Sequence, residues 1–270
     1  MILIRPTHER PLLELFELWP FRYLFLILVW RTLKVRYQQT AIGIAWAVLQ
    51  PLLMTIVFTV IFGLLAHLPT DGKPYPIFVL SGLLVWQFVA QSCQHASTTI
   101  VANYSLVTRI FFPRILLPLA SLAACLFDLI WVLGLLAVFM LWYGVAPTLG
   151  ILAFFPMLVL AAITVLGVSL WLGTLYVSYR DIGHLLPFMI QLWMFASPVI
   201  YPLSLLPPKY AFLYALNPLV VVIETSRWAF CGGTPPQVWM VATAWTVALI
   251  LCLTGLWFFR RQEGTFADIV

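Results

Sequence analysis

The sequence consists largely of apolar runs that are about as long as a lipid bilayer is thick. The hydrocarbon core of a bilayer is about 30 Å across, so a helix needs about 20 apolar residues to span it. Six segments meet or approach this requirement: 41–66, 77–96, 115–143, 151–177, 185–200 and 239–259. The sequence therefore predicts an all-α membrane protein with six transmembrane helices.

The composition excludes an ordinary soluble domain. Apolar residues make up 63% of the chain and charged residues 9%, whereas about 25% of residues are charged in a typical soluble domain. A net charge of +5 would suggest nucleic-acid binding in a soluble protein. In a membrane protein, the positions of the lysines and arginines report topology instead.

The basic residues gather on one side of the predicted spans. Eleven lie on the side of the N-terminus, and three, Lys73, Lys209 and Arg227, lie on the other. Lys and Arg are enriched in cytoplasmic loops, so both termini are predicted to be cytoplasmic. The chain then divides into an N-terminal cytoplasmic segment with an interface helix (1–40), a transmembrane domain (41–259) and a cytoplasmic tail (260–270).

A short helix is predicted before the first span, because the apolar run Leu24–Trp30 is too short to cross a bilayer. Residues three or four apart share a helical face. One face carries Leu26, Trp30, Leu33 and Tyr37, and the opposite face carries Arg31, Lys34 and Gln38. This pattern is typical of an amphipathic helix lying in the membrane interface. The same basic residues also fit a simple anchor for the first span.

The segment between the fifth and sixth spans is rich in proline yet remains apolar. Pro198 and Pro202 end the fifth span after about 16 residues, or roughly 24 Å of helix. The chain then stays apolar to Phe230. Irregular backbone is tolerated at membrane depth where it lines a water-filled cavity, so we predict re-entrant outer gate helices over 201–230. Glu224 and Arg227 are three residues apart and can pair, either structurally or at the mouth of a polar pathway.

Residues that carry chemistry are sparse. The chain has no GxxxxGK[ST] motif, so it does not hydrolyse ATP by a P-loop. Asp128 is the one acid inside an apolar run, and both a functional role and a helix–helix hydrogen bond are open for it. A membrane-embedded enzyme, such as a lipid-linked sugar transferase, is disfavoured because Asp128 and Glu224 lie at different depths and Asp71 lies in a small loop.

Two further features point to function. The predicted cytoplasmic loop 97–114 contains a short helix, Val101–Arg109, which fits either a docking site for another protein or an ordinary connection. Aromatic residues form 16% of the chain, and the tryptophans exceed what two interfacial belts require. Aromatic faces stack on the apolar faces of sugar rings, which would suit a polymer moving through a channel.

Six segments together resemble one family. They are LKVRYQQTAIGIAWAVLQPLL (33–53), YPIFVLSGLLVWQFV (75–89), NYSLVTRIFFPRILLPLAS (103–121), SYRDIGHLLPFMIQLWMFASPVIYPLSLLP (178–207), LYALNPLVVVIETSRWAF (213–230) and FFRRQEGTFADIV (258–270). In this order, and over nearly the whole chain, they resemble the polysaccharide-export ABC transporter permeases. These are the Wzm type of O-antigen exporters and the related TagG type for teichoic acid, with capsule permeases of the KpsM type more distant.

The resemblance implies an ABC exporter permease fold and a transport function rather than an enzyme. Two copies of the chain would pair with two copies of a separate ATPase. ATP and Mg would belong to that partner, with no cofactor or metal in this chain. The substrate would be a polysaccharide on an undecaprenyl-diphosphate carrier, moved from the cytoplasmic to the outer face of the bacterial inner (plasma) membrane. A drug- or lipid-exporting permease of the same superfamily would show the same topology and is the alternative.

The resemblance also implies three sets of site residues. Arg31, Lys34, Arg36 and Tyr37 of the interface helix would bind the diphosphate head group. The coupling loop against the ATPase would use Val101, Asn103, Tyr104, Leu106 and Arg109. The pathway and outer gate would use Trp46, Trp86, Trp193, Tyr201, Tyr210, Tyr214, Glu224 and Arg227.

Overall fold

The computed structural model describes residues 19–38, 43–70, 72–205, 207–264 and 266. Every regular element within these residues is helical, which confirms the all-α prediction. The long helices are α2 (Ala45–Phe58) with its π-helical continuation η2 (Thr59–Leu65), α3 (Tyr75–Ala102), α5 (Leu116–Tyr143), α6 (Ile151–Ser178) and α10 (Val238–Glu263). The shorter helices are α1 (Arg22–Gln38), α4 (Tyr104–Arg109), α7 (Ile182–Phe195), η3 (Leu203–Leu205), η4 (Pro208–Tyr210), α8 (Ala211–Ala215) and α9 (Pro218–Cys231).

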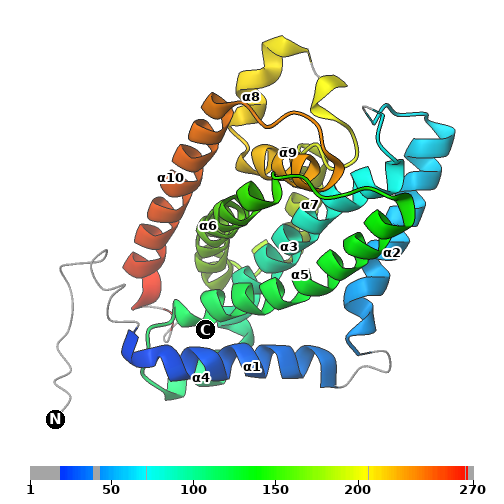
Figure 1. The fold of residues 1–270 in the computed structure, drawn as a ribbon. Helices are drawn as coiled ribbons and strands as arrows, with labels where there is room; N and C mark the ends of the chain where they lie inside the picture. Colours follow the sequence, from blue (N-terminus) through cyan, green and yellow to red (C-terminus); the bar gives the residue numbers. More distant parts are fainter. Residues whose placement is uncertain (1–18, 39–42, 71, 206, 265, 267–270) are drawn as a thin grey trace.

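Helix α3 forms the centre of the bundle and packs against α5, α6 and α9 (Figure 1). Every residue from 77 to 89 is buried. A helix that is apolar all round becomes buried on all sides, and small residues such as Ser81 and Gly82 let neighbouring helices approach closely. The side chains of α5, α6 and α9 therefore converge on α3, while α10 packs against α6 and α1 packs against α5.

Five of the described helices are long and apolar enough to span a bilayer: α2 with η2, α3, α5, α6 and α10. Helix α7 is apolar but has 14 residues, or roughly 21 Å at 1.5 Å per residue, which is short of a core about 30 Å thick. It occupies most of the predicted fifth span. The chain is thus a multi-pass membrane protein, and the count of six spans stays a prediction.

Helices α6 and α10 cross at two glycines that sequence reasoning did not single out. A Cβ added to Gly167 would lie 2.6 Å from the backbone nitrogen of Cys252, and one added to Gly255 would lie 2.5 Å from the carbonyl oxygen of Gly167. Neither position accommodates a side chain. The two backbones are in direct contact here, as is common where helices associate within a membrane.

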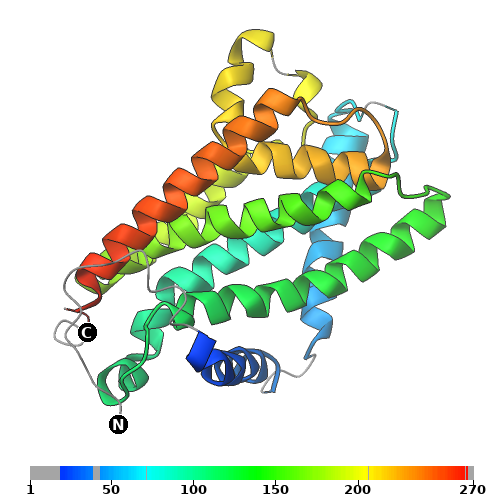
Figure 2. The ribbon, with the colours of Figure 1, turned by 60° about the vertical axis from the view of Figure 1, so that its left-hand side comes forward.

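The two ends of the bundle carry different short helices. Helices α1 and α4 lie at one end, and α8 and α9 lie at the other (Figure 2). Helix α9 packs against α3 and α6, with most of its residues buried. It starts at Pro218 after Asn217, whose side-chain oxygen accepts a hydrogen bond from the backbone N–H of Leu219 at 3.2 Å.

The structure shows which residues of α1 face the protein and which face outward. Leu28 is its buried residue, while Leu26 and Trp30 are exposed and Leu33 is half-buried. Leu28 and Arg36 lie eight residues apart, about two helical turns, so they share the face that packs against α5. Helix α1 therefore has apolar residues on two sides: Leu28 faces the protein, and Leu26 and Trp30 lie on the surface.

Candidate functional site

The end of the bundle that carries α1 contains a charged cluster between α1 and α5. The guanidinium of Arg36 forms an ion pair with the carboxylate of Asp128, and the hydroxyl of Tyr37 donates a hydrogen bond to the other oxygen of that carboxylate. The Sγ of Cys125 lies 3.7 Å from the same guanidinium. Asp128 thus has an ionic partner on α1.

The environment of this cluster fixes its charges. Burial by itself lowers the pKa of Arg36, but Cys125 and Asp128 raise it by more than burial lowers it. The pKa of Arg36 therefore lies above its ordinary value. Burial and the hydrogen bond to Asp128 raise the pKa of Tyr37. At neutral pH, Arg36 is therefore charged and Tyr37 is a neutral donor. The negative charge of Asp128 is paired with the positive charge of Arg36. This pairing favours the structural role of Asp128 between two helices over a role as an unpaired functional acid.

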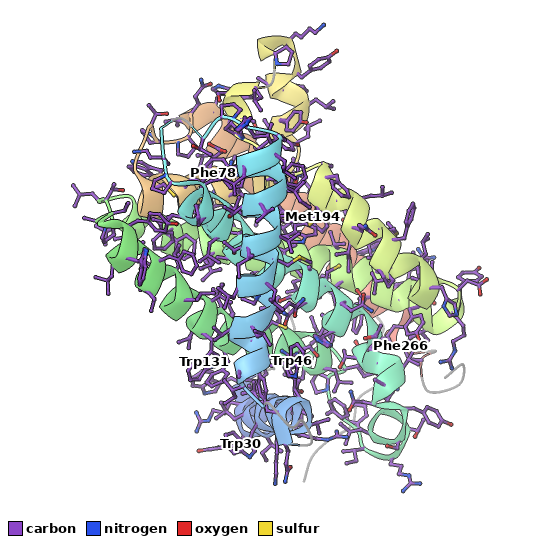
Figure 3. The ribbon with its side chains drawn as sticks, turned by 90° about the vertical axis from the view of Figure 1, so that its right-hand side faces the viewer. Trp30, Trp46, Phe78, Trp131, Met194 and Phe266 are labelled. Carbon is purple, nitrogen blue, oxygen red and sulfur yellow. The ribbon has the colours of Figure 1, made fainter. Side chains whose placement is uncertain are left out.

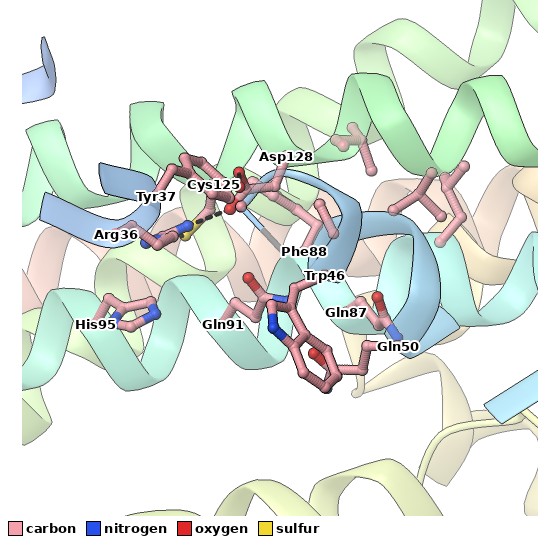
Figure 4. A pocket seen from close by; sticks show the side chains of 15 residues that line it. Arg36, Tyr37, Trp46, Gln50, Gln87, Phe88, Gln91, His95, Cys125 and Asp128 are labelled. Atoms are coloured by element: carbon pink, nitrogen blue, oxygen red, sulfur yellow. Dashed lines mark hydrogen bonds and ion pairs between the residues drawn. The ribbon is translucent and has the colours of Figure 1, made fainter. Parts of the chain in front are cut away.

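A cavity of about 290 Å³ opens beside this cluster, between α1, α2, α3 and α5. Three glutamines line it, Gln50 from α2 and Gln87 and Gln91 from α3, together with Trp46 and His95 (Figure 4). Trp46 lies toward the α1 end of the bundle, whereas Phe78 lies toward the opposite end (Figure 3). The described lining of this cavity includes the predicted head-group residues Arg36 and Tyr37. Trp46 is the one predicted pathway residue in the same described lining.

The predicted coupling helix begins later than expected. Val101 belongs to the last turn of α3, because α3 continues to Ala102, and Asn103 interrupts the helix with φ −112° and ψ 32°. In α4, Val107 is buried, Leu106 is half-buried, and Tyr104 and Arg109 are exposed. The exposed pair marks the surface that α4 presents beyond the bundle.

A buried arginine holds the far end of the bundle together. The guanidinium of Arg227 donates to Glu224 at 2.8 Å and to the carbonyl oxygens of Val199 at 2.9 Å and Tyr201 at 3.1 Å. It also lies 3.8 Å from the ring centre of Phe78. Arg227 therefore ties the segment after α7 to α3 and α9, and the geometry favours the structural alternative for the pair.

A family model described as ABC-2 type transporter matches residues 23–231, which run from α1 to the end of α9. The chain belongs to the ABC-2 type transporter family. It is 30% identical over 259 residues to the O-antigen export system permease protein RfbA of Myxococcus xanthus, covering 94% of this chain and 98% of that one. It is 29% identical over 252 residues to an RfbA of Klebsiella pneumoniae, covering 92% and 96%. It is 24% identical to the polysialic acid transport protein KpsM of Escherichia coli, covering 86% and 91%.

In this ABC-2 transporter, several residues predicted for the pathway and outer gate contact one another. Trp86 is buried and meets Trp193 edge to face, with ring centres 6.4 Å apart. The indole N–H of Trp193 donates to Asn217 at 3.2 Å. The hydroxyls of Tyr201 and Tyr214 lie 3.4 Å apart. Trp86 is thus a core residue, because its neighbours on α3 are buried on every side.

Tyr210 and two of the predicted head-group residues lie on the surface. Tyr210 is exposed and contacts Lys209, with 4.9 Å between the ammonium and the ring centre. Arg31 and Lys34 are exposed on α1, whereas Arg36 faces α5. The glutamines of the cavity were missed because a glutamine carries no charge and matches no catalytic or metal-binding motif. Their spacing on α3, four residues apart, is the signal that places Gln87 and Gln91 on one face.

Proposed function

We propose that this chain is the transmembrane permease of an ATP-driven exporter that moves a lipid-linked polysaccharide from the cytoplasmic to the outer face of the inner membrane. The observation that carries the proposal is the match to permeases named for O-antigen export over more than nine-tenths of both chains. The carrier would be undecaprenyl diphosphate, and the glycan would be similar to an O-antigen. Six spans with re-entrant helices over 201–230 complete the proposed topology.

Helix α4 would transmit the motion of a separate ATPase, which would bind ATP and Mg. Its exposed residues Tyr104 and Arg109 suit contact with a partner, while Val107 holds the helix to the bundle. The guanidinium of Arg31 donates to the side-chain oxygen of Asn103 at 3.1 Å. A displacement of α4 would therefore reach α1 directly, at the end where the lipid head group would enter.

A second copy of the chain would complete the pathway. Helices α2 and α7 expose much of their apolar surface in one protomer, including Leu53, Ile56, Phe188 and Leu192. Extended apolar faces of this kind contact lipid or another subunit. We propose a homodimer of permeases with two ATPase subunits, in which these helices border the path.

The test is reconstitution with the candidate ATPase encoded nearest to this chain. Purified complex in nanodiscs should hydrolyse ATP faster when undecaprenyl-diphosphate-linked glycan is added. A complex whose ATPase lacks its P-loop lysine is the control, and it should show no hydrolysis. Stimulation by lipids or drugs without glycan would instead support the alternative exporter. Failure of any ATPase to associate would contradict the proposal.

A further inference from the structure

The cavity between α1, α2, α3 and α5 suggests which part of the substrate this protein binds, an inference that rests on the proposed function. Gln87 is 8% exposed, and its side chain makes no hydrogen bond to any residue in the described part of the chain. The amide of Gln87 lines the cavity and keeps access to it, so it can bond to a polar occupant such as water or a hydroxyl group.

Within the described part of the chain, the other two glutamines that line the cavity also have unpaired amides. Gln50 and Gln91 also make no side-chain hydrogen bond within the described residues, and they line the cavity with Trp46 and Gln87 (Figure 4). Each glutamine supplies an amide donor and a carbonyl acceptor. Gln87 is buried, whereas Trp46 and Gln50 are exposed in this protomer. The cavity thus has a closed polar wall and an open side.

The charge of the cavity argues against a phosphate as its occupant. Arg36 is the one lysine or arginine among its described lining residues, and it is already paired with Asp128. Binding a diphosphate here would add negative charge beside a carboxylate whose cation is engaged. An acyl chain is equally unsuitable because it would leave the glutamine amides unpaired. A neutral occupant that carries hydroxyl or amide groups beside an apolar face fits this lining.

Size and position narrow the occupant further. A volume of about 290 Å³ lies near the lower end of the roughly 300–1,000 Å³ of small-molecule sites and well above the roughly 30 Å³ that one water occupies. It suits a single sugar ring, which has hydroxyls for the glutamines and an apolar face for the indole of Trp46. The exposed Arg31 and Lys34 lie on the same end helix as Arg36.

We propose that the cavity lined by Trp46, Gln50, Gln87 and Gln91 binds the neutral sugar that is attached directly to the lipid diphosphate. The diphosphate itself stays outside, beside the exposed basic residues of α1. Glutamine amides select the hydroxyls of the sugar, and Trp46 covers its apolar face. This site accounts for the unpaired amides and removes Arg36 from the phosphate-binding set.

The experiment compares two lipids on the full-length permease in nanodiscs. One is undecaprenyl diphosphate, and the other is undecaprenyl diphosphate that carries one neutral N-acetylhexosamine or hexose. The variants Gln87→Met and Gln91→Met retain an unbranched side chain of similar length but lose the amide. Gln94→Met is the control, because Gln94 lies on the same helix but does not line the cavity.

Each cavity variant should weaken binding of the sugar-bearing lipid about tenfold, as expected for a lost hydrogen bond that leaves a polar group unpaired. The cavity variants should bind undecaprenyl diphosphate with wild-type affinity. The control variant Gln94→Met should bind both lipids with wild-type affinity. A thermal unfolding scan shows whether Gln87→Met disturbs folding. If it does, Gln91→Met still tests the inference, because Gln91 is only half-buried.

Three outcomes overturn the inference. Unchanged affinity in both cavity variants means that the cavity holds only water, and an equal loss for both lipids means that the variants act on the diphosphate. A wild-type protein that binds the two lipids equally has no sugar site. These results leave the proposed function intact. If the wild-type protein binds neither lipid, the proposed function fails and the inference fails with it.

Discussion

Arg31 on α1 and Asn103 at the junction of α3 and α4 are joined by a hydrogen bond of 3.1 Å, although 72 residues separate them. The amide of Asn103 also donates to the carbonyl oxygen of Thr99 at 2.8 Å, which fixes it to the end of α3. One side chain therefore links the interface helix to the start of α4. Two regions that the sequence assigned to different tasks are in direct contact.

Replacing Asn103 with Ala should weaken communication between α4 and α1. An exposed hydrogen bond contributes about 0.5–1 kcal/mol, so we expect about a threefold loss of the stimulation of ATP hydrolysis by substrate in the reconstituted complex. Stimulation is measured relative to the basal hydrolysis of each variant, because Asn103 belongs to the predicted coupling loop and its replacement also changes the surface offered to the ATPase. Thr108→Ala, an exposed change within α4, is the control. Full stimulation in Asn103→Ala would show that the contact transmits nothing.

Breaking the pair between Arg36 and Asp128 should destabilise the protein. Removing one member leaves the other charge without its partner in a low-dielectric region, at a cost of about 3 kcal/mol. Asp128→Leu should therefore lower the unfolding temperature in nanodiscs more than the double variant Arg36→Met/Asp128→Leu, which removes both charges. Asp181→Leu, an exposed aspartate, should change little. Equal destabilisation in the single and double variants would contradict a coupled pair.

Arg227 should tolerate even a conservative change poorly. Lys keeps the charge but loses the planar fork that reaches Glu224, Val199 and Tyr201 together. Arg227→Lys should cost about 2 kcal/mol and increase amide hydrogen exchange in the segment after α7, measured by mass spectrometry. Arg180→Lys makes the same change at an exposed arginine and should exchange like the wild type. Unchanged exchange in both variants would mean that other contacts hold this segment.

A side chain at Gly255 should separate α6 from α10. Its added Cβ would meet the carbonyl oxygen of Gly167 at 2.5 Å, so Gly255→Leu forces the helices apart and should lower the unfolding temperature by several degrees, with a cost of about 3 kcal/mol. Gly134→Leu on α5 is the matched control, since a Cβ there meets no atom within 4 Å. A similar response at both glycines would argue against a close crossing.

The sequence by itself determined the class of this protein. Long apolar runs favour helices in a bilayer, because lipid offers no partner to unpaired backbone groups. Their ends are less exact, since the second predicted span stops at 96 while α3 continues to Ala102. The short α7 was also readable, since the prolines after Met194 end it. These properties are local, and each depends on residues that are near one another in the chain.

Rotation and contact between helices were decided by the tertiary structure. Asp128 has no ionic partner within its own helix, and its pairing with Arg36 arises from the way α1 lies against α5. The face of α1 that packs against α5 was decided in the same way. Gly167 and Gly255, or Gln50 and Gln87, carry no mutual signal in one sequence. Their meeting depends on how helices distant in the chain pack around α3, which local periodicity does not specify.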